Sequence, residues 1–594
     1  MRKTSQRFVT GIAAGTLLLA SSQLAFAAGQ AKNVILMISD GQGFNTLKAT
    51  EYYKGGKAVY ESFDVKYGMN TSSAGRRGNY TGQPYSPASM ATSFVYAKSG
   101  ATDSASAATA MFTGVKNYDN EVNYTTDNKA LTTFFEKAAK AGKSIGAVSS
   151  VDWTHATPVS VFGHNIARGN YGQMAKEAIY GSNPNANNAN YDAGNYNGNL
   201  KVVMAPGNPW YDNNAALRTT PNYGLIGEQK HWDDLVAGVN GWNLITTQAQ
   251  FNAMMTGDTP DKVFGMPQAY DTLQYNRTGL GGLNSKKAPY ADALNSGVPT
   301  LATMAKAALN VLDNNPNGFA VMIEGGAIDW ANHADLTGRM IEEQTDFNDA
   351  VQAVVDYLDA GTNGNTWDNT LLIVTADHEC GHLWGDGRVA GSTFFDVNGN
   401  GVFDHGVDYA HVKNNGTGNL PETWYHSTSH TNALVPLFAK GANSDLFANQ
   451  VIGTEPNLKG IYNLDSNWDG KNTYIDNTGV FQVMNMAALA TDISAQVSAA
   501  TSSMAYNRVT RLYNGKLTIT NTSAAPISGQ LIVTLSNLST GVTLTNASGM
   551  DNGAPFIKPA MSGDLAPGAS ITVPLTFSNP SNAKINFTTV TFKN

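Results

Sequence analysis

Short apolar runs, separated by segments with helical periodicity, constrain the fold of this chain more than any other feature of its sequence. The runs are rich in β-branched and aliphatic residues and cover residues 33–39, 144–151, 201–204, 318–323 and 371–375. Such runs are typical of parallel strands that are buried on both faces. Helix-like patterns lie between them, at 131–141, 301–312 and 342–358. The alternation predicts an α/β fold with a doubly wound, mostly parallel sheet and helices on both of its faces.

The pattern changes near residue 500, where apolar and polar residues begin to alternate with a period of two. Clear examples are Leu517 with Ile519, and Val573 with Leu575 and Phe577. Turn-forming residues such as Pro567 and Gly568 separate these stretches. We therefore expect an α/β domain over residues 28–497, followed by an all-β, immunoglobulin-like sandwich over residues 507–594.

The first 27 residues have the pattern of a secretory signal peptide. Arg2, Lys3 and Arg7 precede a short apolar stretch at 8–20, and residues 25–27 read Ala-Phe-Ala, an A-x-A cleavage site. The apolar stretch is too short to span a bilayer, which disfavours a transmembrane anchor, and no later stretch approaches that length. The sequence predicts an exported protein, periplasmic or secreted, without a membrane span.

Charge and cysteine content narrow the function further. The formal net charge is -8, and the cations are spread through the chain. Because contacts to phosphate backbones need clustered Lys and Arg, we expect no nucleic-acid-binding surface. The chain has one cysteine, Cys380, so it forms no intramolecular disulfide.

Carboxylate and imidazole side chains follow the ends of several predicted strands. The residues are Asp40, His155 with Thr157, Glu324, Asp377 and His378. Asp329 and His333 are four residues apart, so they share one face of a helix and can hold one cation. Ligands of open α/β sheets gather at the carboxyl ends of the strands. Asp and His suit Zn²⁺, whereas Glu, Asp and Thr oxygens suit Mg²⁺. The surplus of ligands predicts a multi-metal site, which is typical of phosphate ester hydrolysis.

Six segments in order resemble the alkaline phosphatase family, over nearly all of residues 31–495. They are VILMISDGQG, TDSASAATAMFTGVK, THATPVSVFGHNIAR, VMIEGGAIDWANH, LLIVTADHE and HTNALVPLFAKG. The resemblance implies an exported bacterial phosphomonoesterase with two zinc ions and one magnesium ion beside a serine nucleophile. It also implies phosphate monoesters as substrates, and a monomer or a homodimer as the assembly.

The resemblance assigns the metal ligands residue by residue. The first zinc would be held by Asp329, His333 and His430, the second by Asp40, Asp377 and His378, and magnesium by Asp40, Thr157 and Glu324. His430 is preferred to His426 because HTNALVPLFAKG matches the family pattern. His164 and His231 are interpreted as structural. Some bacterial members have Asp and Lys where this chain has His155 and Trp330, beside the third site. Another divalent metal, such as Co²⁺ or Zn²⁺, is therefore an alternative to Mg²⁺ there.

The segment TDSASAATAMFTGVK contains the implied nucleophile, Ser104, which would form a phosphoserine. Arg168 would bind two phosphate oxygens, and Asp103 would position Arg168. The amino end of a helix starting here favours an anion through its free N–H groups. Ser106 is rotated by about 200° from Ser104 around that helix, so we expect it to face elsewhere.

The sequence leaves open the class of function and the role of Cys380. A phosphodiesterase or sulfatase on the same fold would usually carry Thr or a modified Cys or Ser as nucleophile, and a metal-dependent adhesin would explain the β-rich tail without an enzyme. Cys380 is either a buried packing residue or a further zinc ligand, since thiolates bind zinc well. An insertion around residues 381–425, between His378 and His430, is expected to lie near the site.

Two stretches resemble the D-x-N-x-[DN]-G calcium loop, although turn formation alone also explains them. Their candidate ligands are Asp396, Asn398, Asn400 and Asp404 in the first, and Asp465, Asn467, Asp469 and Asp476 in the second.

Overall fold

A large mixed sheet forms the centre of the molecule in the computed structural model, which describes residues 31–92, 94–181, 198–465, 468, 472–551 and 554–593. The predicted signal peptide, residues 1–27, lies outside these ranges. The described part of the sheet has eleven strands in the order β18-β19-β2-β17-β10-β1-β9-β5-β6-β8-β7. Along the sheet they are Val451–Thr454, Thr473–Asp476, Val65–Asn70, Val435–Gly441, Thr370–Thr375, Asn33–Ser39, Phe319–Gly325, Ser144–Ser149, Leu200–Met204, Val263–Gly265 and Asn243–Ile245.

The five predicted strands correspond to β1, β5, β6, β9 and β10, which pair in parallel through β1 and β9 at the centre of the sheet. The prediction of a mostly parallel sheet is therefore confirmed. On the far side of β10 the pairing changes, because β17 runs antiparallel to both β10 and β2.

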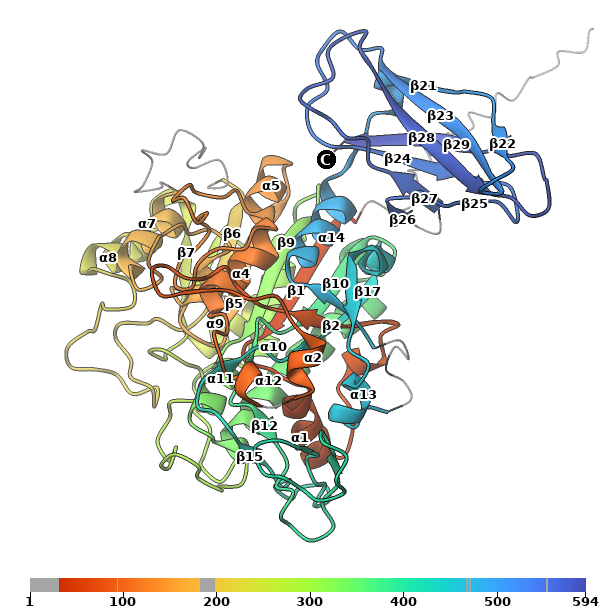
Figure 1. The fold of residues 1–594 in the computed structure, drawn as a ribbon. Coiled ribbons are helices and arrows are strands. Elements are labelled where there is room, and N and C mark those ends of the chain that lie inside the picture. Colours follow the sequence, from red (N-terminus) through yellow and green to blue (C-terminus); the bar gives the residue numbers. More distant parts are fainter. Residues whose placement is uncertain are drawn as a thin grey trace, which may run out of the picture.

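Helices cover both faces of the sheet (Figure 1). Alternate residues of β1 belong to different apolar clusters: Ile35 and Met37 pack with one layer, and Leu36 and Ile38 with the other. The first layer contains α1 (Phe44–Lys54), α10 (Leu301–Leu312) and α12 (Thr337–Asp359). The second contains α4 (Ser104–Thr113), α5 (Phe134–Lys140), α7 (Tyr171–Tyr180) and α14 (Thr478–Leu489). Burial on both faces explains why the strand sequences are continuously apolar.

Residues 491–593, here called the β region, form two antiparallel sheets around a separate apolar cluster. One sheet has the order β20-β29-β24-β27-β26, and the other β21-β23-β28-β25 with β22 beside β23. In the same order, the strands are Thr491–Asp492, Thr588–Lys593, Leu531–Ser536, Ala554–Ile557 and Gly549–Asp551, then Val497–Thr501, Leu512–Asn521, Ser570–Ser578 and Thr543–Leu544, with β22 at Ala505–Asn507. Because β20 and β21 already pair with these sheets, the structural change from the α/β body to the β region falls near Ala490.

The β region packs directly on the α/β body, which comprises the described residues before it. Ile532 and Phe556 belong to the same apolar cluster as α14 of the body, and Phe592 packs against that cluster. Asn449 exchanges two hydrogen bonds with the backbone of Met550, at 2.7 and 2.9 Å. The first sheet of the β region therefore faces the body, and the second faces outward.

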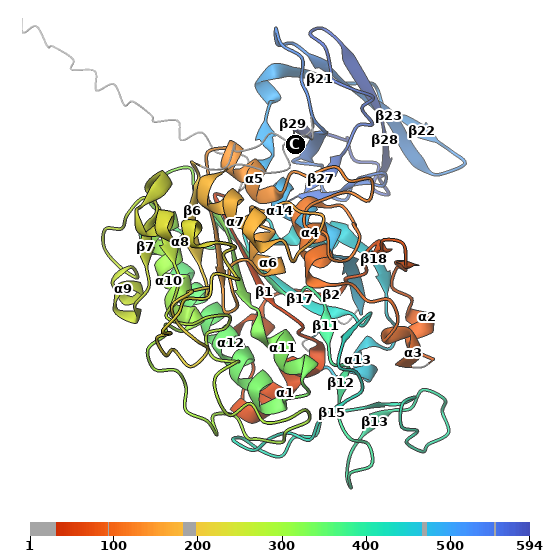
Figure 2. The ribbon, with the colours of Figure 1, turned by 90° about the vertical axis from the view of Figure 1, so that its left-hand side faces the viewer.

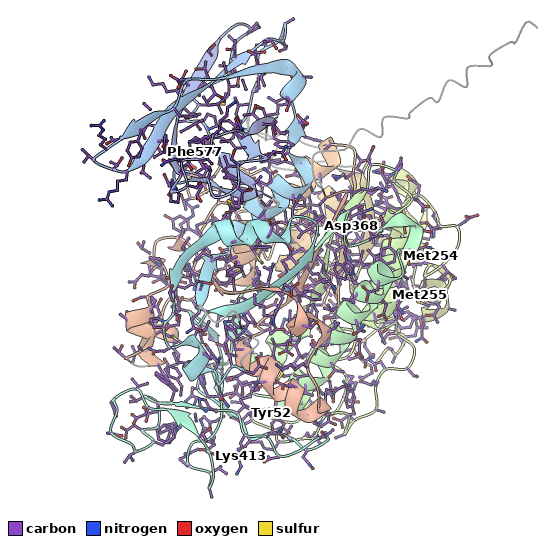
Figure 3. The ribbon with its side chains drawn as sticks, turned by 90° about the vertical axis from the view of Figure 1, so that its right-hand side faces the viewer. Tyr52, Met254, Met255, Asp368, Lys413 and Phe577 are labelled. Atoms are coloured by element: carbon purple, nitrogen blue, oxygen red, sulfur yellow. The ribbon has the colours of Figure 1, made fainter. Side chains whose placement is uncertain are left out.

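The predicted insertion contains short strands, β12 (Leu383–Trp384), β13 (Phe394–Phe395), β14 (Tyr409–Ala410) and β15 (Trp424–Tyr425), which form two small ladders. Figure 3 shows Lys413 of this segment and Phe577 of the β region near opposite ends of the molecule. Among the described residues, the structure contains no helix long and apolar enough to cross a bilayer.

Candidate active site

Three central strands bring their carboxyl ends to one edge of the sheet. Ser39 at the end of β1 lies opposite Gly325 of β9, and Ile38 lies opposite Thr375 of β10. The residues at these ends, Asp40, Glu324 and Asp377, are fully buried. In the structure, these acidic residues lie at or just after strand ends that meet at one edge of the sheet, as the sequence predicts. Figure 2 shows α4, α6 (Ala156–Val159), α11 (Ala327–His333) and the short strand β11 (Glu379–Cys380) grouped in the middle of the α/β body.

The first group of donor atoms combines Asp329, His333, Cys380 and His430, whose ligand atoms all lie within 4.8 Å of one another. The Nε2 atoms of His333 and His430 are 3.0 Å apart and lie 3.3 and 3.4 Å from the Asp329 carboxylate. Burial alone would raise the pKa of Asp329, but the two imidazoles outweigh it and hold the pKa well below its usual value.

Backbone carbonyls orient the two histidines of this group. His333 Nδ1 donates to the carbonyl of Thr428 at 2.7 Å, and His430 Nδ1 donates to the carbonyl of Thr102 at 2.8 Å. Each Nε2 is then left to face the other donor atoms. This is the arrangement that fixes the tautomer of metal-binding histidines.

The second group combines Asp40, Asp377 and His378. His378 Nε2 lies 3.1 Å from Asp377 and 3.6 Å from Asp40. Asp377 and His378 follow β10 rather than continuing it, so the alternation of a regular strand does not separate them. Their placement in one group agrees with the ligand set that the resemblance implies and not with strand spacing.

The third group combines Asp40, His155 and Glu324. Burial, followed by the charge of Asp377, raises the pKa of Glu324 to about 8, although Ser149 donates a hydrogen bond to it. Burial and the nearby Arg168 lower the pKa of His155 to about 3. His155 is thus neutral, and a neutral imidazole can accept a hydrogen bond or bind a metal.

Ser104 begins α4, whose ten residues are all buried. Its Oγ lies 3.2 Å from His378 Nε2, which places it beside the second group. Asp103 caps the helix by accepting a hydrogen bond from the backbone of Ser106 at 3.0 Å. The Ser106 hydroxyl contacts Asp103, Thr102 and Asp119 instead of the metal-site groups, as the helical rotation predicts.

Arg168 reaches the amino end of α4 from a different part of the chain. It pairs with Asp103 at 2.8 Å and donates to His155 Nε2 at 3.1 Å. Burial would raise the pKa of Asp103, but Arg168 outweighs it and lowers the pKa to about 2. Asp103 therefore stays charged and fixes the guanidinium close to Ser104.

Several buried oxygen atoms that could bind a metal have no hydrogen-bond partner among the described residues. These atoms test whether the three groups fit metal ions. They include both oxygens of Asp40, Asp329 Oδ1, Asp377 Oδ2, Glu324 Oε1 and Thr157 Oγ1. Leaving so many acceptors buried and unpaired costs about 1–3 kcal/mol each. Burial and the surrounding carboxylates also raise the pKa of Asp40 well above its usual value, and a bound cation reverses that effect. The three groups fit divalent metals.

The remaining predicted residues lie at the border of the site or away from it. Trp330 is half-buried, with its ring 5.6 Å from that of His155. Tyr275, which the sequence did not indicate, donates from its hydroxyl to the Trp330 carbonyl at 2.9 Å. His426 stacks on Phe94 in an edge-to-face contact outside the donor groups.

The first calcium-like loop is closed by its own hydrogen bonds. Asp396 accepts from the backbone of Gly399 and Gly401 at 2.7 and 2.6 Å. The amides of Asn398 and Asn400 both donate to Asp404, at 2.7 and 2.8 Å. The predicted ligands therefore lie together in space.

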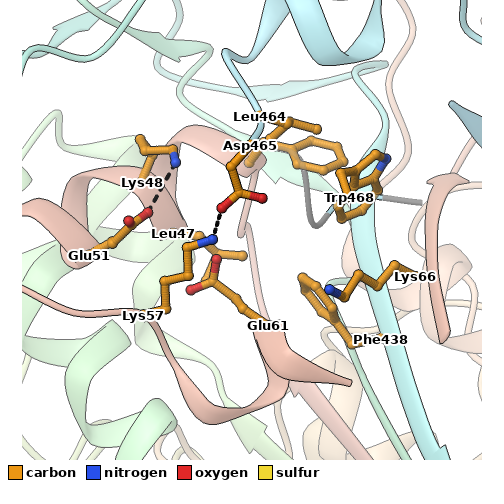
Figure 4. Close-up of a pocket in the computed structure, with 11 residues that line it drawn as sticks. Leu47, Lys48, Glu51, Lys57, Glu61, Lys66, Phe438, Leu464, Asp465 and Trp468 are labelled. Carbon is orange, nitrogen blue, oxygen red and sulfur yellow. Dashed lines mark hydrogen bonds and ion pairs between the residues drawn. The ribbon is translucent and has the colours of Figure 1, made fainter. Parts of the chain in front are cut away.

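In the second loop, Asn467 and Asp469 lie outside the described residues. Asp465 pairs with Lys57 across the pocket drawn in Figure 4. Asp476 accepts from Asn70 at 2.7 Å and pairs with Lys116 at 3.1 Å. Both carboxylates thus already have cationic partners.

The family model, the curated relatives and the solved structure that resemble this chain all carry the same family name. The family model described as alkaline phosphatase matches residues 31–402, more than half of the chain. The match ends within the predicted insertion, so His430 lies beyond it.

Among curated proteins, alkaline phosphatase 3 of Bacillus subtilis is 27% identical over 351 residues, covering 59% of this chain and 61% of that protein. Alkaline phosphatase H of Pseudomonas aeruginosa is 29% identical over 364 residues, covering 59% and 69%. The chain thus spans about three fifths of the length of the first of these relatives.

A solved structure supports the fold. A mutant of TAB5 alkaline phosphatase with Mg bound in its M3 site is 22% identical, with a TM-score of 0.50, covering 77% of this chain and 98% of that one. At this identity the likeness concerns the fold alone. The family model, which matches more than half of the chain, leads to one conclusion: the chain belongs to the alkaline phosphatase family.

Proposed function

We propose that this protein hydrolyses phosphate monoesters to an alcohol and inorganic phosphate through a phosphoserine formed on Ser104. The observation that carries the proposal is the position of that hydroxyl, buried at the first residue of α4 and 3.2 Å from His378 Nε2. An anion at this helix end is stabilised by free N–H groups and by the helix dipole.

The proposed cofactors are two zinc ions and a third divalent ion. Asp329, His333 and His430 would hold the first zinc, and Asp40, Asp377 and His378 the second. Asp40, Thr157 and Glu324 would hold the third ion, Mg²⁺ or another divalent metal, beside His155. When bound, such ions act as Lewis acids that lower the pKa of a hydroxyl or water and stabilise the leaving oxygen.

The chain's own residues account for binding and bond formation. Arg168 binds two phosphate oxygens through its planar guanidinium, and Asp103 holds it in place. The Ser104 oxygen loses its proton and attacks phosphorus in line, while the bond from phosphorus to the leaving oxygen breaks and the alcohol takes up a proton. Water then attacks the phosphoserine, releasing phosphate and restoring the hydroxyl of Ser104.

Several features of the whole protein belong to the same proposal. Residues 1–27 act as a signal peptide, and the protein is exported to the periplasm or secreted, as a monomer or homodimer. The α/β body, which ends near Ala490 rather than at the predicted residue 497, forms the catalytic domain, and the two sheets of the β region form an immunoglobulin-like accessory sandwich. The 396–404 loop binds Ca²⁺.

The test compares release of an aryl alcohol from an aryl phosphate monoester with release from the matching diester, at alkaline pH. The monoester should react far faster, and a chelator should abolish turnover until zinc and magnesium are restored. Ser104→Ala should lower turnover by ~10³-fold or more, with the metal content, measured by mass spectrometry, unchanged.

Ser106→Ala is the matched control, since it removes a hydroxyl two residues along the same helix. We expect it to keep turnover within about tenfold of the parent. Acid-quenched enzyme should carry phosphate on the peptide that contains Ser104. Persistent turnover of Ser104→Ala, or preference for the diester, would contradict the proposal.

A further inference from the structure

The single cysteine of the chain lies on a two-residue ladder that also carries a predicted zinc ligand. Strand β11 (Glu379–Cys380) pairs antiparallel with β16 (His430–Thr431), and Cys380 is the direct partner of His430. Directly opposed residues of an antiparallel pair place their side chains on the same face of the ladder, with Cβ atoms about 4.5–5.5 Å apart. The Cys380 thiol and the His430 imidazole therefore face the same way.

The side chains of the other pair in this ladder lie on its opposite face and bind each other. Glu379 and Thr431 are also direct partners, and the Thr431 hydroxyl donates a hydrogen bond to the Glu379 carboxylate. These two side chains satisfy each other and turn away from the donor atoms. The ladder thus separates a structural pair from a pair that faces the first metal group.

Cys380 is surrounded by ligand atoms rather than by apolar side chains alone. Its residue is fully buried, and its Sγ lies within 4.8 Å of ligand atoms of Asp329, His333 and His430. Asp329 Oδ1 is itself buried and has no hydrogen-bond partner among the residues that the structure describes. The backbone N–H of Cys380 donates to the Gly41 carbonyl at 3.1 Å, which ties the ladder to the residue after Asp40.

Gly41 keeps this arrangement close. Its φ is +73°, and a Cβ at this position would meet Asp329 Cα at 2.7 Å, a distance that side chains do not tolerate. The backbone at Gly41, to which the N–H of Cys380 donates, can therefore lie against Asp329 only because glycine stands here.

We infer that Cys380 is a sulfur ligand of the first metal ion, with the metal replacing the thiol proton. The inference rests on the proposed function for the identity of that ion, but its geometry stands on the four donor atoms. Asp, two His and Cys supply four donors of the types that bind zinc, and zinc can expand to five ligands when a substrate oxygen enters. Sulfur also favours softer ions over Mg²⁺ or Mn²⁺ at this position.

The test is the optical spectrum of the cobalt-substituted full-length protein, in parent and Cys380→Ser forms. Because the chain has one cysteine, a near-ultraviolet thiolate-to-cobalt charge-transfer band can come only from Cys380. We expect the band in the parent and its loss in Cys380→Ser. X-ray absorption of the two-zinc protein should give about one sulfur neighbour per two zinc ions, at about 2.3 Å.

Metal retention supplies an independent readout. Competition with a chromophoric chelator should give a dissociation constant for the first ion that is about tenfold or more higher in Cys380→Ser. Cys380→Ala, which adds no polar atom, should weaken binding equally. Cobalt bound without a sulfur band, or unchanged retention in both variants, would overturn the inference and assign Cys380 to packing or to hydrogen bonding with Asp329.

The experiment separates this inference from the proposed function. A protein that hydrolyses monoesters but lacks the band refutes the ligand role and leaves the function intact. A protein with the band but without phosphatase activity refutes the function and keeps the ligand. Circular dichroism of both variants establishes that they fold.

Discussion

Two buried ionic clusters of the α/β body differ in how they satisfy their charges. In the structural cluster, His164 lies between Glu177, 3.1 Å from Nδ1, and Glu136, 3.4 Å from Nε2. The backbone N–H groups of His164 and Thr133 donate to the same carboxylates. In the candidate active site, by contrast, neither oxygen of Asp40 has a hydrogen-bond partner within the described part of the chain. The protein completes the first cluster with its own groups, whereas the second contains groups that could hold cations.

This contrast separates groups that stabilise the fold from groups that are kept for function. Buried polar groups are normally paired, and the pairs around His164 follow that rule. Among the described residues, carboxylate oxygens without a partner lie together at the carboxyl ends of β1, β9 and β10, on Asp40, Glu324 and Asp377, whereas Glu121, Asp335 and Glu343 each carry a single one elsewhere. Four predictions test the comparison, beginning with the largest expected change in stability.

Breaking the structural cluster should lower the free energy of unfolding more than any other change considered below. Glu177→Gln leaves the His164 imidazolium buried with one carboxylate fewer, so the free energy of unfolding should fall by about 3–5 kcal/mol. Denaturant unfolding measures the change, and the metal content should stay the same. Glu228→Gln is the matched control, because Glu228 is 54% exposed beside the buried His231, and its effect should stay within about 1 kcal/mol. Equal effects of the two variants would contradict the comparison.

The same cluster predicts a pH dependence of stability. Burial alone lowers the pKa of His164, but Glu136 and Glu177 outweigh it and raise the pKa to about 10. The folded protein therefore holds a proton more tightly than the unfolded chain. The stabilisation is fully present below the unfolded value, about 6.5, and is lost as the pH rises toward 10. Denaturation at several pH values should show a fall of up to about 1.4 kcal/mol per pH unit from this group. The slope should shrink in Glu177→Gln, and an unchanged slope would assign the effect to other groups.

In the candidate active site, removing a carboxylate should raise the free energy of unfolding when metal is absent, which is the opposite of the effect in the structural cluster. Asp40→Asn removes a buried carboxyl group whose oxygens accept no hydrogen bond among the described residues and whose ionised form is disfavoured by burial and by Asp377. The metal-free protein should therefore become more stable by about 1–3 kcal/mol. The same variant should lose metal from the second and third groups when metals are supplied. Thermal unfolding with and without chelator, together with metal analysis, measures both effects. If the metal-free variant were less stable than the metal-free parent, Asp40 would have to make stabilising interactions without a cation, and the prediction would be wrong.

The surface loop at 396–404 should give the smallest effect, because its oxygens already accept hydrogen bonds within the loop. Calcium should raise the unfolding free energy of the parent by on the order of 1 kcal/mol through mass action. Asp404→Ala should remove this increase, since Asp404 is the acceptor of both Asn398 and Asn400. An equal calcium effect in parent and variant would place the ion elsewhere.

The central strands and the edge of the sheet where the acidic groups meet could be predicted because both follow from local patterns. Apolar runs buried on both faces identify β1, β5, β6, β9 and β10, and the residues after them must converge at one edge. Strand β2 lacks such a signal, since it contains Lys66 and Gly68 and alternates only in part. Strand β17 begins with a buried apolar run, but that run does not reveal that the strand is antiparallel to β10 and β2. Their register depends on contacts between residues far apart in the sequence.

The parts of the site that escaped prediction are set by backbone geometry. A ladder of two residues has no periodicity, so the sequence did not reveal that Cys380 lies opposite His430. The carbonyls of Thr102 and Thr428 orient two imidazoles, and any residue type supplies a carbonyl. In the β region, strand β24 makes contacts on both of its faces, which alternation does not reveal. Val533 enters the core between the two sheets, whereas Ile532 packs on the α/β body.

The position of the β region also determines which way the candidate active-site edge of the sheet faces. Ala31, two residues before β1, donates its backbone N–H to the Ala487 carbonyl in α14 at 2.7 Å. The β region, which follows α14, therefore adjoins the amino end of the sheet, while Asp40 follows the carboxyl end. The seven residues of β1 separate these ends by about 23 Å. If the outward sheet of the β region were fixed to a solid support, the reactive edge would point into the solvent, so immobilisation through this face would leave diffusion of substrate unobstructed.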